Sequence, residues 1–259
     1  MYKEIRGLVN TPVMMKRTLT LALLLFAIAN AHADRLSEKM EKLGFLEAEP
    51  PKPGSKEVLE ANHGDAFIVE LKEDLIIRPP RDGELYSPEV VFDAGSVKYI
   101  GVDRGEFGGG LYINSYNKNE KPFFSGNIDA LIPINDDLYI LEGLAHLVYN
   151  GGSIHVIRDY KEPSTPERVT LLPSAPEAML VDVIHGRKRI VIAGHGSFMI
   201  FEPDYRLQIT HHNTFWRSLY PSSIVKYRDF YVFGIRSGVV ATATTGWDRH
   251  TIRYFKPRE

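Results

Sequence analysis

The chain contains no cysteine, no large excess of either charge and no apolar run as long as a membrane-spanning helix. The lack of cysteine excludes a disulfide framework and a cysteine-ligated zinc or iron–sulfur site. The formal net charge is −2 over 259 residues, which excludes a strongly basic nucleic-acid binder. Since 44% of the residues are hydrophobic, the chain has enough apolar side chains for a sizeable core. We therefore expect a globular protein without nucleic-acid partners.

The first 33 residues have the pattern of a secretory signal peptide. Lys16 and Arg17 form a basic segment, residues 19–29 are apolar, and Ala31 and Ala33 are small residues suited to a cleavage site. The apolar run is shorter than the about 20 residues of a spanning helix. We expect cleavage after Ala33 and no stable membrane span afterwards. An uncleaved anchor is the alternative.

Removal of residues 1–33 would leave a mildly acidic protein that is either periplasmic or secreted. The segment holds four basic residues and one acidic residue, so its loss changes the net charge from −2 to −5. Residues 1–13 are polar and fit poorly ahead of a basic segment. This indicates a start of translation at Met14 or Met15.

Residues 34–63 connect the predicted signal to the main domain. Leu36, Met40 and Leu43 recur at helical spacing, which predicts a short amphipathic N-terminal helix. Residues 47–55 are rich in proline, which cannot continue a helix and favours extended backbone. The helix either docks on the domain or caps an interface, and the spacer leaves both alternatives open.

From residue 64 to residue 259, short β-type runs alternate with glycine, Asn-Asp and proline turn signals. The clearest unit spans residues 128–172 and predicts four strands, with turns at residues 135–137 and 150–152. Comparable units begin at Glu89, Ala178 and Ser222, so successive units are offset by 39, 50 and 44 residues. These offsets are near the about 40–45 residues of a propeller blade.

This rhythm resembles the β-propeller class across residues 64–259. The resemblance implies an all-β fold of four to five blades, each of four antiparallel strands, with the hairpin at residues 66–78 contributing to a fifth blade. The chain lacks the sequence patterns of WD40 and kelch repeats. Glutaminyl cyclotransferases and calcium-activated nucleotidases are small exported propellers of similar length, but their functional motifs do not map onto this chain. A β-sandwich or barrel is the alternative fold.

Equivalent loops of a propeller open on one face around the axis, so the repeat locates a candidate ligand site. After the second strand of each unit stands a cationic or titratable side chain. The four are Arg104, His146, His195 and Arg236. Such a ring would receive an anionic group. However, their offsets from the preceding strand glycines are 3, 3, 1 and 2 residues, so the four side chains need not point in the same direction. In the alternative, these side chains bond to loop carbonyls or pair with nearby acidic residues.

The loop that contains Asp103 and Glu106 is the second candidate, because Gly108–Gly110 follows it. A glycosidase needs two carboxylates beside the sugar bond, and Asp103, Glu106 and Glu142 are the candidates. The alternative is a solvated turn in which glycine permits positive φ.

The connection at residues 213–221 concentrates Phe215, Trp216, Arg217 and Tyr220. Tryptophan, tyrosine and arginine are enriched at binding hot spots, which makes Trp216 and Arg217 candidate contacts. Alternatively, Phe215 and Trp216 fill the gap between two blades.

Metal and nucleophile chemistry have little support in the sequence. Four histidines, His146, His195, His211 and His212, raise the question of a metal site, but no H-E-x-x-H, H-x-H or Asp-rich calcium loop is present. The nucleophile motif G-x-S-x-G is also absent. We expect neither a bound metal nor a cofactor.

Together these patterns favour an exported binding module that recognises a protein partner or a glycan of the cell envelope through its loop face. One version is an inhibitor or immunity-type protein. The rival class is a small hydrolase or lyase for a sugar, peptide or phosphoester, with Asp103, Glu106, His146 and His195 as acid–base groups. A structural scaffold is a third reading, and the oligomeric state is left open.

Overall fold

The computed structural model describes residues 35–85, 89–204, 206–244 and 251–258. The predicted signal segment, residues 1–33, lies outside these described residues. Within the described part of the chain, no helix is both long and apolar enough to cross a bilayer.

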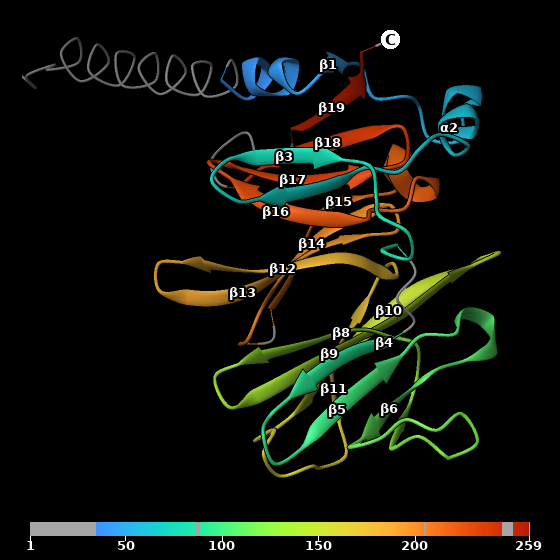
Figure 1. Ribbon diagram of the computed structural model, residues 1–259, viewed down its shortest axis with the longest axis vertical. Coiled ribbons are helices and arrows are strands. Elements are labelled where there is room, and N and C mark those ends of the chain that lie inside the picture. The colour runs from blue at the N-terminus through green and yellow to red at the C-terminus, as the bar shows by residue number, and fades with distance from the viewer. Residues whose placement is uncertain (1–34, 86–88, 205, 245–250, 259) are drawn as a thin grey trace, which may run out of the picture.

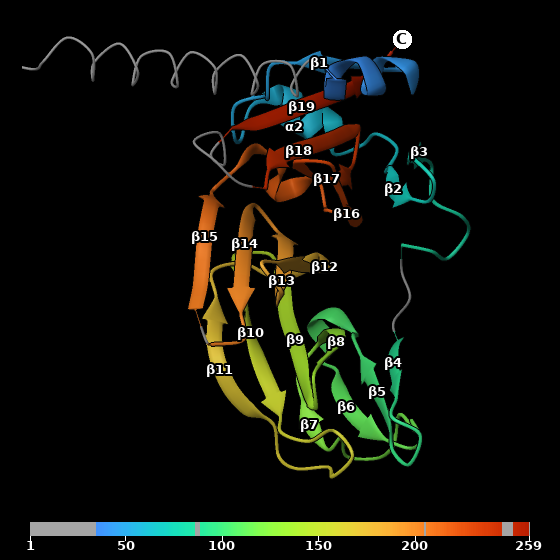
Figure 2. The same ribbon diagram turned by 90° about the vertical axis from the view of Figure 1, so that its left-hand side faces the viewer.

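Five antiparallel sheets, which we call blades I to V in chain order, are arranged about a common axis (Figures 1 and 2). Blade I comprises β2 (Ile68–Leu71) and β3 (Leu75–Arg78), and blade II comprises β4 (Glu89–Asp93), β5 (Lys98–Val102), β6 (Gly110–Ile113) and β7 (Phe124–Ser125). Blade III comprises β8 (Ile128–Ile134), β9 (Asp137–His146), β10 (Tyr149–Ile157) and β11 (Glu167–Leu172). Blade IV comprises β12 (Pro176–Ile184), β13 (Arg187–Gly194), β14 (Ser197–Glu202) and β15 (Arg206–His212). Blade V comprises β16 (Ser223–Tyr227), β17 (Phe230–Ile235), β18 (Gly238–Ala243), β19 (Ile252–Pro257) and β1 (Phe45–Ala48).

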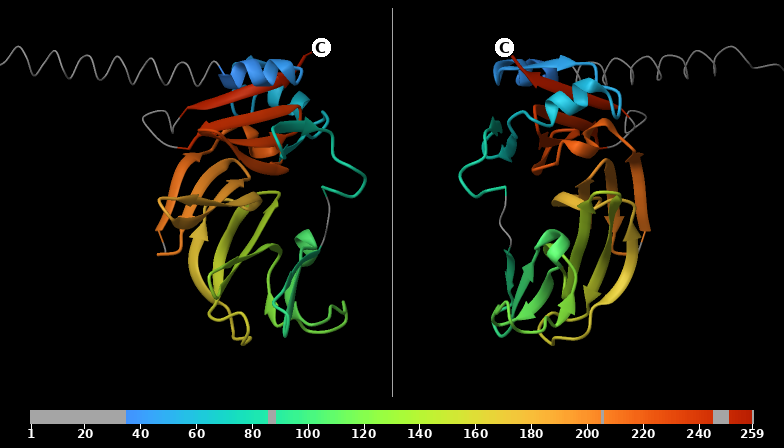
Figure 3. Two further views of the ribbon diagram at one scale, coloured as in Figure 1. Left: turned by 60° about the vertical axis from the view of Figure 1, so that its left-hand side comes forward. Right: turned by 90° about the vertical axis from the view of Figure 1, so that its right-hand side faces the viewer.

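The inner strands of neighbouring blades contact one another. β2 lies against β16, β16 against β12, β12 against β8, and β8 against β4. Consecutive strands pair within each blade, so the chain runs from the axis to the outer edge before the next blade begins (Figure 3). The predicted all-β, propeller-like fold is therefore confirmed, and the hairpin predicted to join a fifth blade forms the two-stranded blade I.

The middle strands of blades IV and V are buried on both faces. Every residue from Ile190 to Gly194 is buried, and so is every residue from Tyr231 to Ile235. Each blade is covered by a neighbour, and Phe198 of blade IV stacks on Phe233 of blade V with ring centroids 5.9 Å apart. This double coverage explains why these strands read as continuous apolar runs rather than as alternating ones.

The turn predicted at residues 150–152 is wrong. These residues lie inside β10, and the β9–β10 hairpin turns instead at Leu147, whose φ is 54°. Gly152 stands opposite Gly143 on β9. A Cβ at Gly143 would come within 2.4 Å of Cδ of Pro176. The glycines therefore allow the start of β12 to approach this sheet closely, which is the second common use of glycine in a strand.

The N-terminal segment docks on blade V, which resolves the alternative left open by the sequence. Residues 35–42 are helical, and Leu36 and Met40 are buried in a cluster that includes Phe255 of β19. β1 then adds a fifth strand to blade V by pairing with β19. The spacer leads to a helix that the sequence did not predict, α2 (Lys56–Ala61), whose first turn is capped by the side chain of Ser55.

Substitution in β1 tests this docking. Phe45→Ala removes a buried ring that packs edge-to-face on Phe67 at 5.1 Å, and we expect the free energy of unfolding to fall by about 3–5 kcal/mol. The matched control is Leu46→Ala, because Leu46 points to the opposite side of the strand and is 43% exposed. Urea denaturation measures both, and equal losses would show that β1 is not anchored through Phe45.

A buried polar cluster joins blades IV and V. Asp182 of β12 is 6% exposed and accepts hydrogen bonds from Lys226 of β16 at 2.8 Å, from Arg189 of β13 at 3.3 Å and from the Tyr231 hydroxyl of β17. Its carboxylate is thus shared by two cations and a phenol from both blades. Because a buried carboxylate needs such partners, the cluster fixes how the two sheets sit against each other.

Loss of the Asp182 charge is expected to weaken this junction. Asp182→Asn leaves Lys226 and Arg189 without their anion, and the free energy of unfolding should fall by about 2–3 kcal/mol. Asp204→Asn is the matched control, since Asp204 also pairs with an arginine but lies on the surface. Thermal denaturation should show a clear drop in Tm for the first variant and little change for the second. A small effect of both would contradict a structural role for the cluster.

Candidate functional site

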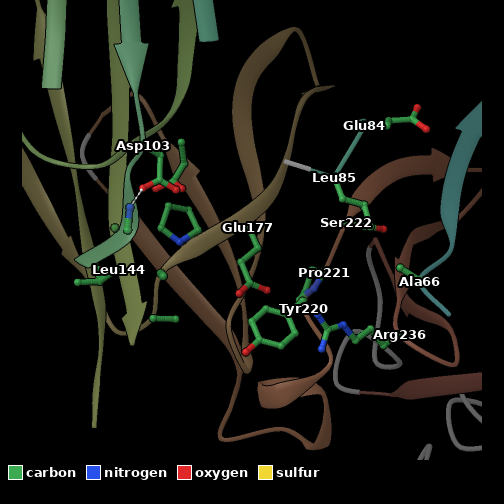
Figure 4. A pocket seen from close by; sticks show the side chains of 16 residues that line it. Ala66, Glu84, Leu85, Asp103, Leu144, Glu177, Tyr220, Pro221, Ser222 and Arg236 are labelled. Atoms are coloured by element: carbon green, nitrogen blue, oxygen red, sulfur yellow. Dashed lines mark hydrogen bonds between the residues drawn. The ribbon is translucent and has the colours of Figure 1, made fainter. Parts of the chain in front are cut away.

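A pocket of about 500 Å³ lies where the inner strands of the blades converge, and we call it the axial pocket. Residues from all five blades and their connections line it, which places it on the axis rather than between two blades (Figure 4). Its polar lining consists chiefly of Glu84, Asp103, Asp129, Glu177, Tyr220, Ser222 and Arg236.

Two of these side chains occupy equivalent positions in blades III and IV. Asp129 is the second residue of β8, and Glu177 is the second residue of β12. The register of each inner strand shifts at that residue, so each carboxyl stands at a β-bulge. A bulge locally re-aims a side chain, and here it brings both carboxyls to the axial pocket.

Each carboxyl has one oxygen without a protein partner. Oδ2 of Asp129 and Oε2 of Glu177 are buried atoms that no described group hydrogen-bonds. Burial raises the pKa of Asp129 well above its ordinary value, and the nearby carboxylates of Asp103, Glu177 and Glu142 raise it further. Burial also raises the pKa of Glu177, against the opposing effects of His195 and Arg236. The pocket therefore favours protonated carboxyls.

Glu177 belongs to a chain of side chains along one wall of the pocket. Its Oε1 lies 2.7 Å from Nδ1 of His195, whose ring meets the edge of Tyr220. Arg236 lies over the Tyr220 ring, with its guanidinium carbon 4.5 Å from the centre of the ring. Figure 4 shows the Glu177 carboxyl directed toward Tyr220. Arg236 is held by Asn62, which accepts from it through both its backbone and side-chain oxygens.

The four side chains of the predicted cationic ring do not meet in one pocket. Arg236 lines the axial pocket, whereas His195 does not line it and contacts Glu177, which does. Arg104 is exposed and donates to the carbonyl of Gly108, whereas His146 is exposed and lies 2.9 Å from Glu106. The two exposed side chains stand three residues after their strand glycines, whereas His195 and Arg236 follow theirs by one and two residues. The short 3₁₀ helix η1 (Gly105–Phe107) comes directly after Arg104.

The remaining candidates are divided between the pocket and the protein interior. Asp103 lines the pocket and accepts from the backbone N–H of Gly105 at 2.7 Å. Trp216, in the 3₁₀ helix η2 (Phe215–Ser218), is fully buried, and its indole N–H donates to the carbonyl of Gly194. Arg217 of the same helix is exposed. Phe215 and Trp216 therefore fill the space between blades IV and V.

Asp129 and Glu177 are not among the residues predicted from the sequence, although the sequence carries a signal for them. Alignment of the two units on their inner strands places Asp129-Ala130 over Glu177-Ala178, an acidic residue followed by alanine at the start of a β-type run. The predicted side chains follow the second strand of each unit, whereas these two carboxyls lie at the start of the first strand.

The described residues contain no group of three or more histidine, aspartate or glutamate side chains arranged to hold a metal ion. Glu142, whose charge also acts on Asp129, accepts a hydrogen bond from the Ser153 hydroxyl. Its Oε1 lies 3.7 Å from Nε2 of His155. The axial pocket thus presents carboxyl groups beside an arginine and an aromatic ring, and His195 contacts one of these carboxyls.

No protein family and no curated protein matches the chain. Among solved structures it is similar to the "AfRom2 CNH domain", with 14% identity and a TM-score of 0.38 over 61% of this chain and 52% of that one. It is also similar to the computationally designed Ika8 protein, with 11% identity and a TM-score of 0.32 over 70% and 72% of the two chains. A hemopexin fold protein, CP4 from cow pea, shows 10% identity and a TM-score of 0.29 over 67% and 89%. The chain spans about half the length of the first of these, and none of the likenesses assigns a function.

The raised pKa of Asp129 predicts a particular pH dependence of stability. An unfolded aspartate titrates near about 3.9, and because the folded protein holds this proton more tightly, its stabilising contribution is complete below that pH. The contribution declines as the pH rises toward the raised folded value. Asp129→Asn should therefore flatten the fall in Tm across this range and raise Tm near neutral pH. The exposed Glu167→Gln is the control, and a slope unchanged by Asp129→Asn would contradict the assignment.

Proposed function

We propose that this protein is an exported, propeller-like binding protein whose axial pocket holds a saccharide unit of a glycan. Export rests on the signal pattern of residues 1–33, and the binding role rests on the pocket. The observation that carries the proposal is the pair of carboxyl side chains, Asp129 and Glu177, that line one pocket and each keep a buried oxygen without a protein partner.

Unpaired buried oxygens favour a ligand that brings its own hydrogen-bonding groups. A buried polar atom without a partner costs about 1–3 kcal/mol, and a ligand that pairs with both oxygens would recover that free energy. A saccharide carries adjacent hydroxyl groups, each of which both donates and accepts. The carboxyls of Asp129 and Glu177 would bond such hydroxyls in either protonation state, because a carboxylate accepts and a protonated carboxyl also donates.

The rest of the pocket suits the same ligand. Tyr220 is 42% exposed and offers part of an aromatic ring beside Arg236, which is already fixed by Asn62. Tyr220 also has a φ of 50°, a conformation that is uncommon for a bulky residue and concentrates at ligand sites. The volume, about 500 Å³, falls within the range of small-molecule pockets.

Oligosaccharide binding to the purified protein tests the proposal. We expect saturable binding in a glycan screen followed by calorimetry, and Glu177→Ala and Tyr220→Ala should each weaken it by about tenfold or more, since each removes a contact worth at least 1.4 kcal/mol. Glu167→Ala, on the outer strand β11, is the matched control and should bind normally. Absence of binding to any glycan, or capture of a protein that occupies the pocket instead, would overturn the proposal.

A second candidate function is acid–base cleavage of the same ligand. The observation that favours it is the different surroundings of two carboxyls whose pKa burial raises: neighbouring carboxylates surround Asp129, whereas Glu177 contacts His195 at 2.7 Å. Groups with such different environments are suited to the proton transfers of a hydrolase or lyase. Mass spectrometry of the bound oligosaccharide distinguishes the two, because a binding protein returns it intact.

A further inference from the structure

We infer that the saccharide bound by the axial pocket carries a protonated amine, which would lie between the carboxyl groups of Asp129 and Glu177. This inference rests on the proposed function and specifies the chemical class of its ligand.

Acidic side chains outnumber basic ones in the pocket lining. Glu84, Asp103, Asp129 and Glu177 are acidic, and among the described lining residues Arg236 is the basic one. Glu84 is neutralised by its ion pair with Arg78, and it also accepts a hydrogen bond from the backbone N–H of Arg81. The other three carboxyls therefore determine the electrostatic character of the pocket.

Asp129 is surrounded by groups of its own sign. The carboxyls of Asp103, Glu142 and Glu177 face it from blades II, III and IV, and the favourable contribution comes from the backbone N–H of Gly143. Glu177 is better compensated, by His195 and at longer range by Arg236. A cation placed between Asp129 and Glu177 would remove the repulsion at the least compensated point of the pocket.

An ammonium group fits this position better than a metal ion does. It has three donors, enough to bond the carboxyl of each residue, Asp129 and Glu177, and one further acceptor. Calcium takes six to eight oxygen ligands, whereas the described residues offer no group of three or more suitable side chains. The two free oxygens come from separate strands, as expected for a ligand that bridges blades III and IV.

Amine binding would also displace protons. A cation beside Asp129 favours its ionised form, so a carboxyl that is protonated in the free protein would release its proton when the amine binds. Affinity for the amine should therefore increase with pH until the amine itself loses its proton. A neutral sugar of the same size would show neither effect.

The closing experiment compares two ligands that differ at the amine. Calorimetry on the full chain, at a mildly acidic pH, would use the glucosamine trimer and the N-acetylglucosamine trimer. We expect the glucosamine trimer to bind at least about tenfold more tightly, with proton release that is detected as a dependence of the heat on the buffer. The neutral trimer should release no proton.

The variants separate charge from hydrogen bonding. Asp129→Asn and Glu177→Gln keep polar side chains of the same shape but remove the negative charge, so each should reduce the preference for glucosamine to within about threefold while leaving the neutral trimer bound. Glu167→Gln is the matched control and should keep the full preference. Circular dichroism and Tm confirm that each variant is folded.

The possible outcomes distinguish this inference from the proposed function. Equal binding of the two trimers overturns the amine inference and leaves saccharide binding intact. Binding of a simple amine such as n-butylamine, with neither trimer bound, overturns the saccharide proposal and supports an amine site. Calcium binding that blocks the pocket, or no binding of trimers and amine alike, overturns the inference.

Discussion

The structure depends on one packing constraint: the apolar face of each sheet must be buried against another element. Sheets packed successively about an axis satisfy this constraint, and blades III, IV and V each lie between two neighbours. The middle strands of blades IV and V are buried almost completely as a result. The same arrangement brings the inner strands together, and with them the side chains at the starts of those strands.

Blade V is built from both ends of the described chain, and this links the N-terminal segment to the stability of the whole domain. β1 covers the edge of β19 that would otherwise expose unpaired backbone groups. The helix at residues 35–42 then covers the adjoining apolar surface. Between blades IV and V, Asp182 adds a polar contact with defined geometry to a largely apolar interface. Apolar packing supplies most of the stabilisation, whereas the hydrogen bonds restrict how the two sheets can be oriented.

The axial pocket differs from the rest of the structure in how its charges are compensated. Asp182 and Glu84 are neutralised by cations of the chain itself. Asp129 and Glu177 stand at bulges and line the axial pocket, and each keeps one buried oxygen without a protein partner. Asp129 and Glu177 are by contrast incompletely paired, at one position of two successive blades. This contrast is what makes the pocket, rather than the exposed Arg104–Gly110 loop, the centre of the proposed function.

The sequence by itself determined the all-β composition, the four-strand rhythm and the amphipathic helix, because these follow from local periodicity and from turn residues. It also pointed to Asp103, His195 and Arg236, which lie in or next to the pocket. Only the tertiary structure decided that residues 150–152 belong to a strand, since glycine there serves the close approach of Pro176 and not a turn. Likewise, the convergence of Asp129 and Glu177 required bulges and the packing of separate blades. Register and close approach between sheets arise from contacts between residues that are distant in sequence, so a local sequence pattern does not predict them.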